Sequence, residues 1–182
     1  MKTIKFFAIA ALFLGFSVSA MSQNTANANA SASANLIKPI SIEKNLDLLF
    51  GDIILNGSAA STVVFTTSSD VPTYTGSAAA YASADASTRQ RAKFTVDGET
   101  DAKYSITIKD GAGGTGDANQ VTLSKGDDNM VVDLVQSKVA TANVISATAA
   151  QNEIFVGGTL NIKANQALGA YTGTFNVTVA YE

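Results

Sequence analysis

The C-terminal stretch of residues 169–182, GAYTGTFNVTVAYE, decides the fold, because apolar and polar side chains alternate along most of its length. A period of two places alternate side chains on opposite faces of an extended strand. The face expected to meet the core carries Tyr171, Gly173, Phe175, Val177, Val179 and Tyr181. The other face carries alanine, threonine and asparagine, so the stretch predicts a half-buried strand over residues 170–181.

Strand-like sequence of the same kind extends back to residue 36. Short runs rich in β-branched and aromatic residues predict strands at residues 36–42, 46–50, 52–55, 61–67, 92–96, 103–109, 120–124, 129–135 and 153–164. Asn-Gly, Asp-Gly and Gly-Gly pairs predict turns at residues 56–57, 97–98, 110–111 and 157–158. Residues 77–92 and 136–151 could each be a loop or a short helix. Many short strands at near-regular spacing predict an all-β protein, an antiparallel sandwich or barrel.

A low-complexity segment, SQNTANANASASAN at residues 22–35, precedes these strands. Every second position is apolar across Ala26, Ala28, Ala30, Ala32, Ala34 and Leu36. This order predicts an extended strand with one apolar face, and asparagine and serine are poor helix residues. A solvated linker of the same composition is the alternative.

The first twenty residues have the layout of a secretory signal peptide. Lys2 and Lys5 precede a thirteen-residue apolar run, FFAIAALFLGFSV, and small residues lead up to Ala20. The run is too short for a spanning helix, which needs about 20 apolar residues. We therefore expect an exported protein, in the periplasm, on the outer cell surface or outside the cell, without a membrane span in the mature chain. The expected organisation is a signal peptide over residues 1–20, an extension over residues 21–35 and a sandwich domain over residues 36–182.

The composition excludes many kinds of active site. The chain has no Cys, His or Trp, which excludes thiol nucleophiles, Ser-His-Asp triads, disulfides and Cys or His metal sites. The aspartates at positions 110, 117, 127 and 128 do not follow the spacing of a Ca²⁺ loop, so turns explain them better. A paired-carboxylate glycosidase is the common enzyme class left open, and the absence of Trp argues against it. We predict no catalytic residue, metal or cofactor, and a net charge of −3 argues against a nucleic-acid partner.

A small basic run lies beside Phe94. Arg89, Arg91 and Lys93 alternate, which would place them on one face of a strand. Charged side chains are commonly used to protect an exposed sheet edge. The pattern therefore predicts an edge strand here.

The C-terminal stretch resembles the last strand of bacterial fimbrial subunits that are assembled through chaperones and ushers. Their signature is alternating apolar residues, a penultimate Tyr and a Gly fourteen places from the end, matched here by Tyr181 and Gly169. Two further stretches, VGGTLNIKANQALG at residues 156–169 and LDLLFGDI at residues 46–53, resemble the exported bacterial domain-of-unknown-function family 4402. That similarity runs loosely over residues 26–182.

The resemblance implies an immunoglobulin-like antiparallel sandwich that lacks one strand, with a groove that a neighbour's N-terminal extension fills. Backbone hydrogen bonds would give affinity and alternate side chains would give register. The implied donor strand is the alternating segment Ala26, Ala28, Ala30, Ala32, Ala34 and Leu36. The implied groove strand carries Gly169, Tyr171, Phe175, Val177, Val179 and Tyr181. The chain departs from the usual fimbrial pattern in lacking Cys and in having an alanine-faced donor.

These features predict a structural or adhesive exported protein, a fimbria-like subunit that assembles by β-strand addition. Its partners would be copies of itself or related subunits, with a periplasmic chaperone covering the open edge. The alternative is a self-contained monomeric secreted β-sandwich that binds a ligand or extracellular matrix. In that case the N-terminal segment pairs within its own chain or is a linker.

Overall fold

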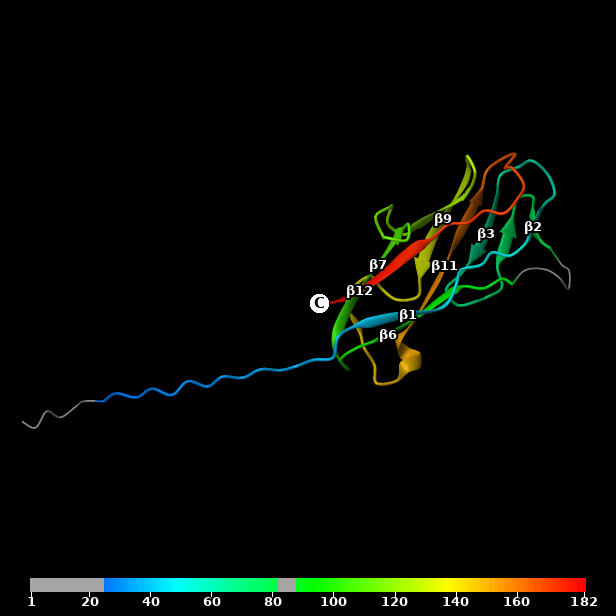
Figure 1. The fold of residues 1–182 in the computed structure, drawn as a ribbon. Helices are drawn as coiled ribbons and strands as arrows, with labels where there is room; N and C mark the ends of the chain where they lie inside the picture. The colour runs from blue at the N-terminus through cyan, green and yellow to red at the C-terminus, as the bar shows by residue number, and fades with distance from the viewer. Residues whose placement is uncertain (1–24, 82–87) are drawn as a thin grey trace, which may run out of the picture. The chain divides into compact units, whose positions relative to one another are not determined.

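A computed structural model describes residues 25–81 and 88–182, and these residues form an all-β protein (Figure 1). The chain divides into two units between residues 36 and 37. Residues 25–36 are exposed and form no strand, so every described strand lies within Ile37–Glu182. In the described part of the chain, no helix is long and apolar enough to cross a membrane.

The larger sheet is built around one long strand, β11. One side of β11 pairs with β9, and the other side pairs first with β6 and then with β3. Three further strands extend the sheet, because β8 pairs with β9, β1 with β6 and β4 with β3, all antiparallel. The bounds are β1 Ser41–Leu46, β3 Ser61–Phe65, β4 Thr73–Thr75, β6 Ala92–Asp97, β8 Gln120–Lys125, β9 Asp128–Gln136 and β11 Glu153–Ile162.

A second sheet has three strands, with β7 (Lys103–Asp110) between β10 (Asn143–Val144) and the C-terminal strand β12 (Phe175–Tyr181). A small third sheet pairs β2 (Ile53–Leu55) with β5 (Ala78–Ala80). A short 3₁₀ helix, Ala149–Asn152, leads into β11. Residues 82–87, within one of the two ambiguous segments, lie outside the described residues.

The core lies between the two larger sheets, as the alternation predicts. In β7, Tyr104, Ile106 and Ile108 are buried, and their neighbours along the strand are more exposed. The larger sheet contributes the buried side chains Phe65, Phe94, Val96, Val121, Met130, Val132, Leu134, Ile154, Val156, Leu160 and Ile162. The predicted all-β antiparallel sandwich is therefore confirmed.

Several predicted strand bounds are wrong. The first strand begins at residue 41 rather than 36, and residues 47–50 form only one bridge, between Leu49 and Gln90. The last strand begins at Phe175 rather than residue 170. The reason is that Thr172 bonds to Ser124 of β8, whereas Thr174 accepts a bond from Gly111 beside β7. Residues 172–174 therefore pass from the larger sheet to the second sheet, so they cannot pair continuously with a single strand.

The turn predicted at Gly157 and Gly158 is also wrong, because β11 runs straight through both residues. A Cβ on Gly157 would lie 2.4 Å from the carbonyl oxygen of Phe65, and one on Gly158 would lie 2.6 Å from that of Asp133. Glycine inside a strand marks a close approach of another backbone. The pair therefore allows neighbouring strands to crowd against β11 where its partner changes from β6 to β3.

The basic run does not protect an edge, because β6 lies inside the sheet between β1 and β11. The Arg91 side chain is largely buried and donates from Nε to Asp70 Oδ1 at 2.8 Å and from Nη2 to Asp70 Oδ2 at 3.1 Å. Its guanidinium carbon lies 4.4 Å from the centre of the Phe155 ring. Arg91 thus ties the loop at Asp70 to the sheet.

Acid should weaken the Asp70–Arg91 pair. The Arg91 hydrogen bonds hold the pKa of Asp70 below its usual value, which is about 3.9 in an unfolded chain. The stabilisation is therefore complete above about pH 4 and is lost as the pH falls through the lower, folded pKa. We expect Asp70→Asn to lower the free energy of unfolding at pH 7 by about 1 kcal/mol, since solvent screens this half-exposed carboxylate.

Urea denaturation at a series of pH values measures this effect. The difference between wild type and Asp70→Asn should shrink below about pH 4. Asp47→Asn, which removes an exposed partner of Lys44, should change stability little at any pH. A difference for Asp70→Asn that stays constant into acid would contradict the ion pair.

Candidate strand-binding site

The C-terminal strand β12 is paired on one side only, among the residues that the structure describes. Its ladder partner is β7, with Phe175 opposite Asp110 and Tyr181 opposite Tyr104. Thr174 accepts a bond from Gly111 N–H, and Glu182 N–H donates to Lys103, so even-numbered residues bond toward β7. Backbone groups alternate in direction along an antiparallel strand. The N–H and C=O groups of the odd-numbered residues of β12 therefore point to the open edge.

The first strand, β1, lies beside β12 but shares no ladder with it (Figure 1). Tyr181, at the end of β12, contacts Lys38 just before β1. At the other end, Phe175 packs edge-on against Phe94, which is paired with Lys44 in β1. The two strands therefore run in opposite directions. The edge of β12 that faces β1 has no ladder partner among the described residues.

A polar clamp holds the start of the domain to the end of β12. The Tyr181 hydroxyl accepts a hydrogen bond from Glu99 N–H and donates one to the Lys38 carbonyl, both at 2.7 Å. Lys38 N–H donates to the Glu99 carboxylate at 2.9 Å, and its ammonium pairs with Asp97. A Cβ on Gly98 would lie 2.5 Å from the Tyr181 hydroxyl, so this residue leaves room for the ring. The clamp ties the residues just before β1 to the end of β12.

Removing the clamp hydroxyl with Tyr181→Phe should lower the free energy of unfolding by about 1 kcal/mol, because the part-buried Glu99 N–H and the exposed Lys38 carbonyl lose a partner. Chemical denaturation measures the loss, and proteolysis near residue 38 should become faster. Tyr74→Phe is the matched control, since the Tyr74 hydroxyl has no partner within the described part of the protein. Equal stability of both variants would contradict the clamp.

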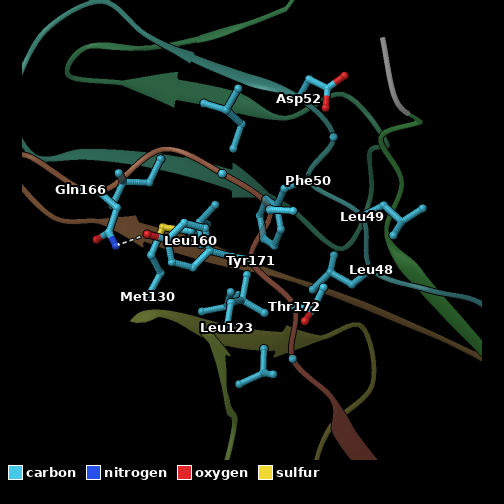
Figure 2. A pocket seen from close by; sticks show the side chains of 18 of the residues that line it. Leu48, Leu49, Phe50, Asp52, Leu123, Met130, Leu160, Gln166, Tyr171 and Thr172 are labelled. Carbon is cyan, nitrogen blue, oxygen red and sulfur yellow. Dashed lines mark hydrogen bonds between the residues drawn. The ribbon is translucent and has the colours of Figure 1, made fainter. Parts of the chain in front are cut away.

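An apolar cleft of about 640 Å³ continues from the beginning of β12. We define the apolar cleft as the space between residues 48–55 on one side and residues 166–175 on the other. Its floor consists of core side chains from β8, β9 and β11: Val121, Leu123, Met130, Val132, Leu160 and Ile162. Figure 2 shows Phe50 and Tyr171 among the side chains at the centre of the cleft, with Asp52 farther out.

The wall at residues 166–173 is tied down at several points. The Tyr171 hydroxyl donates to the Ala167 carbonyl and accepts from Gln166 Nε2, each at 2.8 Å (Figure 2). Thr172 exchanges two backbone bonds with Ser124. A Cβ on Gly173 would lie 2.2 Å from the Thr122 carbonyl oxygen, so glycine permits the close approach to β8. The cleft thus has one fixed wall.

The structure places four of the predicted groove residues, Phe175, Val177, Val179 and Tyr181, in β12, whereas Gly169 and Tyr171 precede this strand. Val177 is buried, and Tyr171, Phe175, Val179 and Tyr181 are half-buried against the core. Gly169 and Gly173 line the apolar cleft and lie outside β12. The predicted donor residues Ala26, Ala28, Ala30, Ala32, Ala34 and Leu36 are exposed and outside any strand in this single chain.

Sequence reasoning missed the other wall of the site. Leu48 and Phe50 border the cleft, whereas the pattern placed them in an ordinary strand over residues 46–50. Lys38 was not singled out either. In the stretch LDLLFGDI, Leu48, Leu49 and Phe50 are apolar at consecutive positions. A half-buried strand would alternate apolar and polar residues, so this run was the sequence signal that the segment is not an ordinary strand.

Asp110, one of the loop aspartates, has a structural role. Asp110 accepts hydrogen bonds from Gly111 N–H at 2.8 Å and from Thr122 N–H at 3.1 Å, which holds the turn after β7. Within residues 25–81 and 88–182, no group of three or more acidic side chains is placed to hold a metal ion.

Fold and site together define an antiparallel β-sandwich in which an open strand edge leads into an apolar cleft. The chain belongs to a family described as a domain of unknown function (DUF4402), whose model matches residues 40–181. The match covers every strand of the sandwich. Comparison with curated proteins and with solved structures found no match.

Proposed function

We propose that this protein is an exported structural subunit that assembles by strand addition, in the manner of a fimbrial subunit. The observation that carries the proposal is the open backbone edge of β12 beside an apolar cleft. An added strand would satisfy the outward N–H and C=O groups and cover the apolar floor in one step.

The strand that fits this position is the N-terminal extension of another copy or of a related subunit. Residues 26–36 alternate small apolar and polar side chains, as a strand with one buried face requires. At about 3.3 Å per residue, these eleven residues reach roughly 36 Å, which is longer than the seven-residue strand β12. Contacts of this head-to-tail kind extend into filaments.

Export and chaperoning belong to the same proposal. An exposed strand edge above an apolar floor promotes aggregation, so a periplasmic chaperone would cover the edge until assembly. The apolar run of residues 6–18 supports export through a signal peptide. Mass spectrometry of the protein recovered from the producing cells should find a chain that starts after Ala20.

Size-exclusion chromatography with light scattering tests assembly. Residues 21–182 should form a ladder of oligomers, whereas residues 36–182 should stay monomeric, because the deletion removes all of the donor except Leu36 and no strand of the sandwich. Circular dichroism must show the same β content for both proteins. If both are equally stable monomers, the extension is a linker, and the protein is a self-contained sandwich whose ligand has to be sought elsewhere.

A further inference from the structure

We propose that Leu36 of one copy inserts into the apolar cleft of a second copy, with its donor strand antiparallel to β12. This inference rests on the proposed strand addition and specifies its direction and register. Three observations support it: the width of the site, the size of the donor side chains and the position of the clamp.

The site is wide at one end and narrow at the other. At the beginning of β12 the apolar cleft encloses about 640 Å³, within the roughly 300–1,000 Å³ of typical binding pockets. At the Tyr181 end of β12, the clamp joins Tyr181 to Lys38 and Glu99. A donor strand that fits this shape needs small side chains along most of its length and a large one at the cleft end.

The extension has this distribution of sizes. Five of the six residues on its apolar face are alanine, and the sixth, Leu36, is the last along the chain. The Leu36 side chain is 92% exposed, so it has little packing within its own chain. An antiparallel strand brings Leu36 to the cleft, whereas a parallel strand would bring Ala26 there. The parallel arrangement would leave a void above Met130 and Leu160, and unfilled apolar volume is destabilising.

The clamp makes the contact intermolecular. Lys38 is held at the Tyr181 end of β12, and the cleft begins at the Phe175 end. The seven residues of β12 span about 20 Å. The two-residue step from Leu36 to Lys38 covers at most about 7 Å. A chain therefore cannot place Leu36 in its own cleft while its clamp is closed, but it can place Leu36 in the cleft of a neighbour.

A disulfide trap tests the register in the full chain, which has no native Cys to interfere. Ala170 lines the cleft and is exposed, so a cysteine is tolerated there. We expect oxidised Leu36→Cys/Ala170→Cys chains to form a covalent ladder, with residue 36 of one chain joined to residue 170 of the next. The matched pair Ala26→Cys/Ala170→Cys should form at least tenfold less ladder, because a disulfide requires Cα atoms about 4.4–6.8 Å apart.

Each other outcome overturns a defined part of the proposal. A ladder from the Ala26 pair alone would reverse the strand direction, and a disulfide closed within one chain would exclude the intermolecular contact. If wild type assembles but neither cysteine pair forms a covalent ladder, the proposed register is wrong, whereas strand addition is not contradicted. A wild-type chain that remains monomeric would overturn strand addition itself, and the register with it.

A second measurement needs no cysteine. Leu36→Ala should weaken assembly by about 10- to 100-fold, as expected for losing a buried leucine side chain. Ile37→Ala removes a similar volume from the opposite face of the strand and should change assembly less than about threefold. Equal effects of the two variants would show that Leu36 does not occupy the cleft.

Discussion

Chains carrying Ala30→Asp should fail to assemble at concentrations where wild type forms oligomers. Ala30 lies in the middle of the alternating apolar face, so in an added strand its side chain would point toward the sandwich core. Burying an unpaired carboxylate costs several kcal/mol, which corresponds to more than a 100-fold loss of affinity. Light scattering across a concentration series gives the association constant.

Asn29→Asp is the matched control for this substitution. It introduces the same charge one residue away, on the polar face of the same strand. An outward carboxylate remains hydrated, so assembly should change by less than about tenfold. A flexible linker would respond equally to both changes. Normal assembly of Ala30→Asp would therefore exclude the donor-strand role of residues 26–36.

Gly157→Ala should be the most destabilising single substitution of those considered for the sandwich. The added methyl would lie 2.4 Å from the Phe65 carbonyl oxygen, and both groups are backbone-fixed within the sheet. Overpacking of this kind costs about 3 kcal/mol or more when the neighbour cannot move away. The expected result is a clear shift of the urea midpoint with an unchanged slope.

Gly113→Ala provides the control for Gly157→Ala. A Cβ at Gly113 would have its nearest neighbour at 3.9 Å, which is ordinary contact. Its stability should remain within about 0.5 kcal/mol of wild type. If Gly157→Ala is equally mild, the junction of β11 with β6 and β3 is more adaptable than its geometry indicates.

The strands that could be predicted from the sequence are those in which apolar and polar residues alternate regularly. In β7 and β12 the period of two identified the buried faces around Ile106 and Val177. The Asp-Gly turns after β6 and β7 were also predictable, because glycine and aspartate have local conformational preferences. The strands β4, β5 and β10 were missed, since runs of two or three residues are too short to establish a period.

The sequence carries local patterns for the proposed groove strand and donor, but it does not carry the geometry of the site. The alternating face of the C-terminal strand and the alanine-faced extension are local patterns. The clamp depends on a hydrogen bond between residues 143 positions apart, and no local pattern encodes such a pair. Arg91 illustrates the same limit, because its alternation with Lys93 suggested an exposed face whereas Asp70 and Phe155 enclose it.

By itself, the sequence determined that the protein is all-β, which face of β12 is buried, and that Cys and His chemistry is absent. Only the tertiary structure decided that β12 keeps one open edge, that β6 is interior and that Gly157 lies at a strand junction. The physical reason is that the alternation of apolar and polar residues depends only on which face of a strand meets the core and which meets solvent. The choice of partner for each edge depends on the summed packing of strands far apart in the chain.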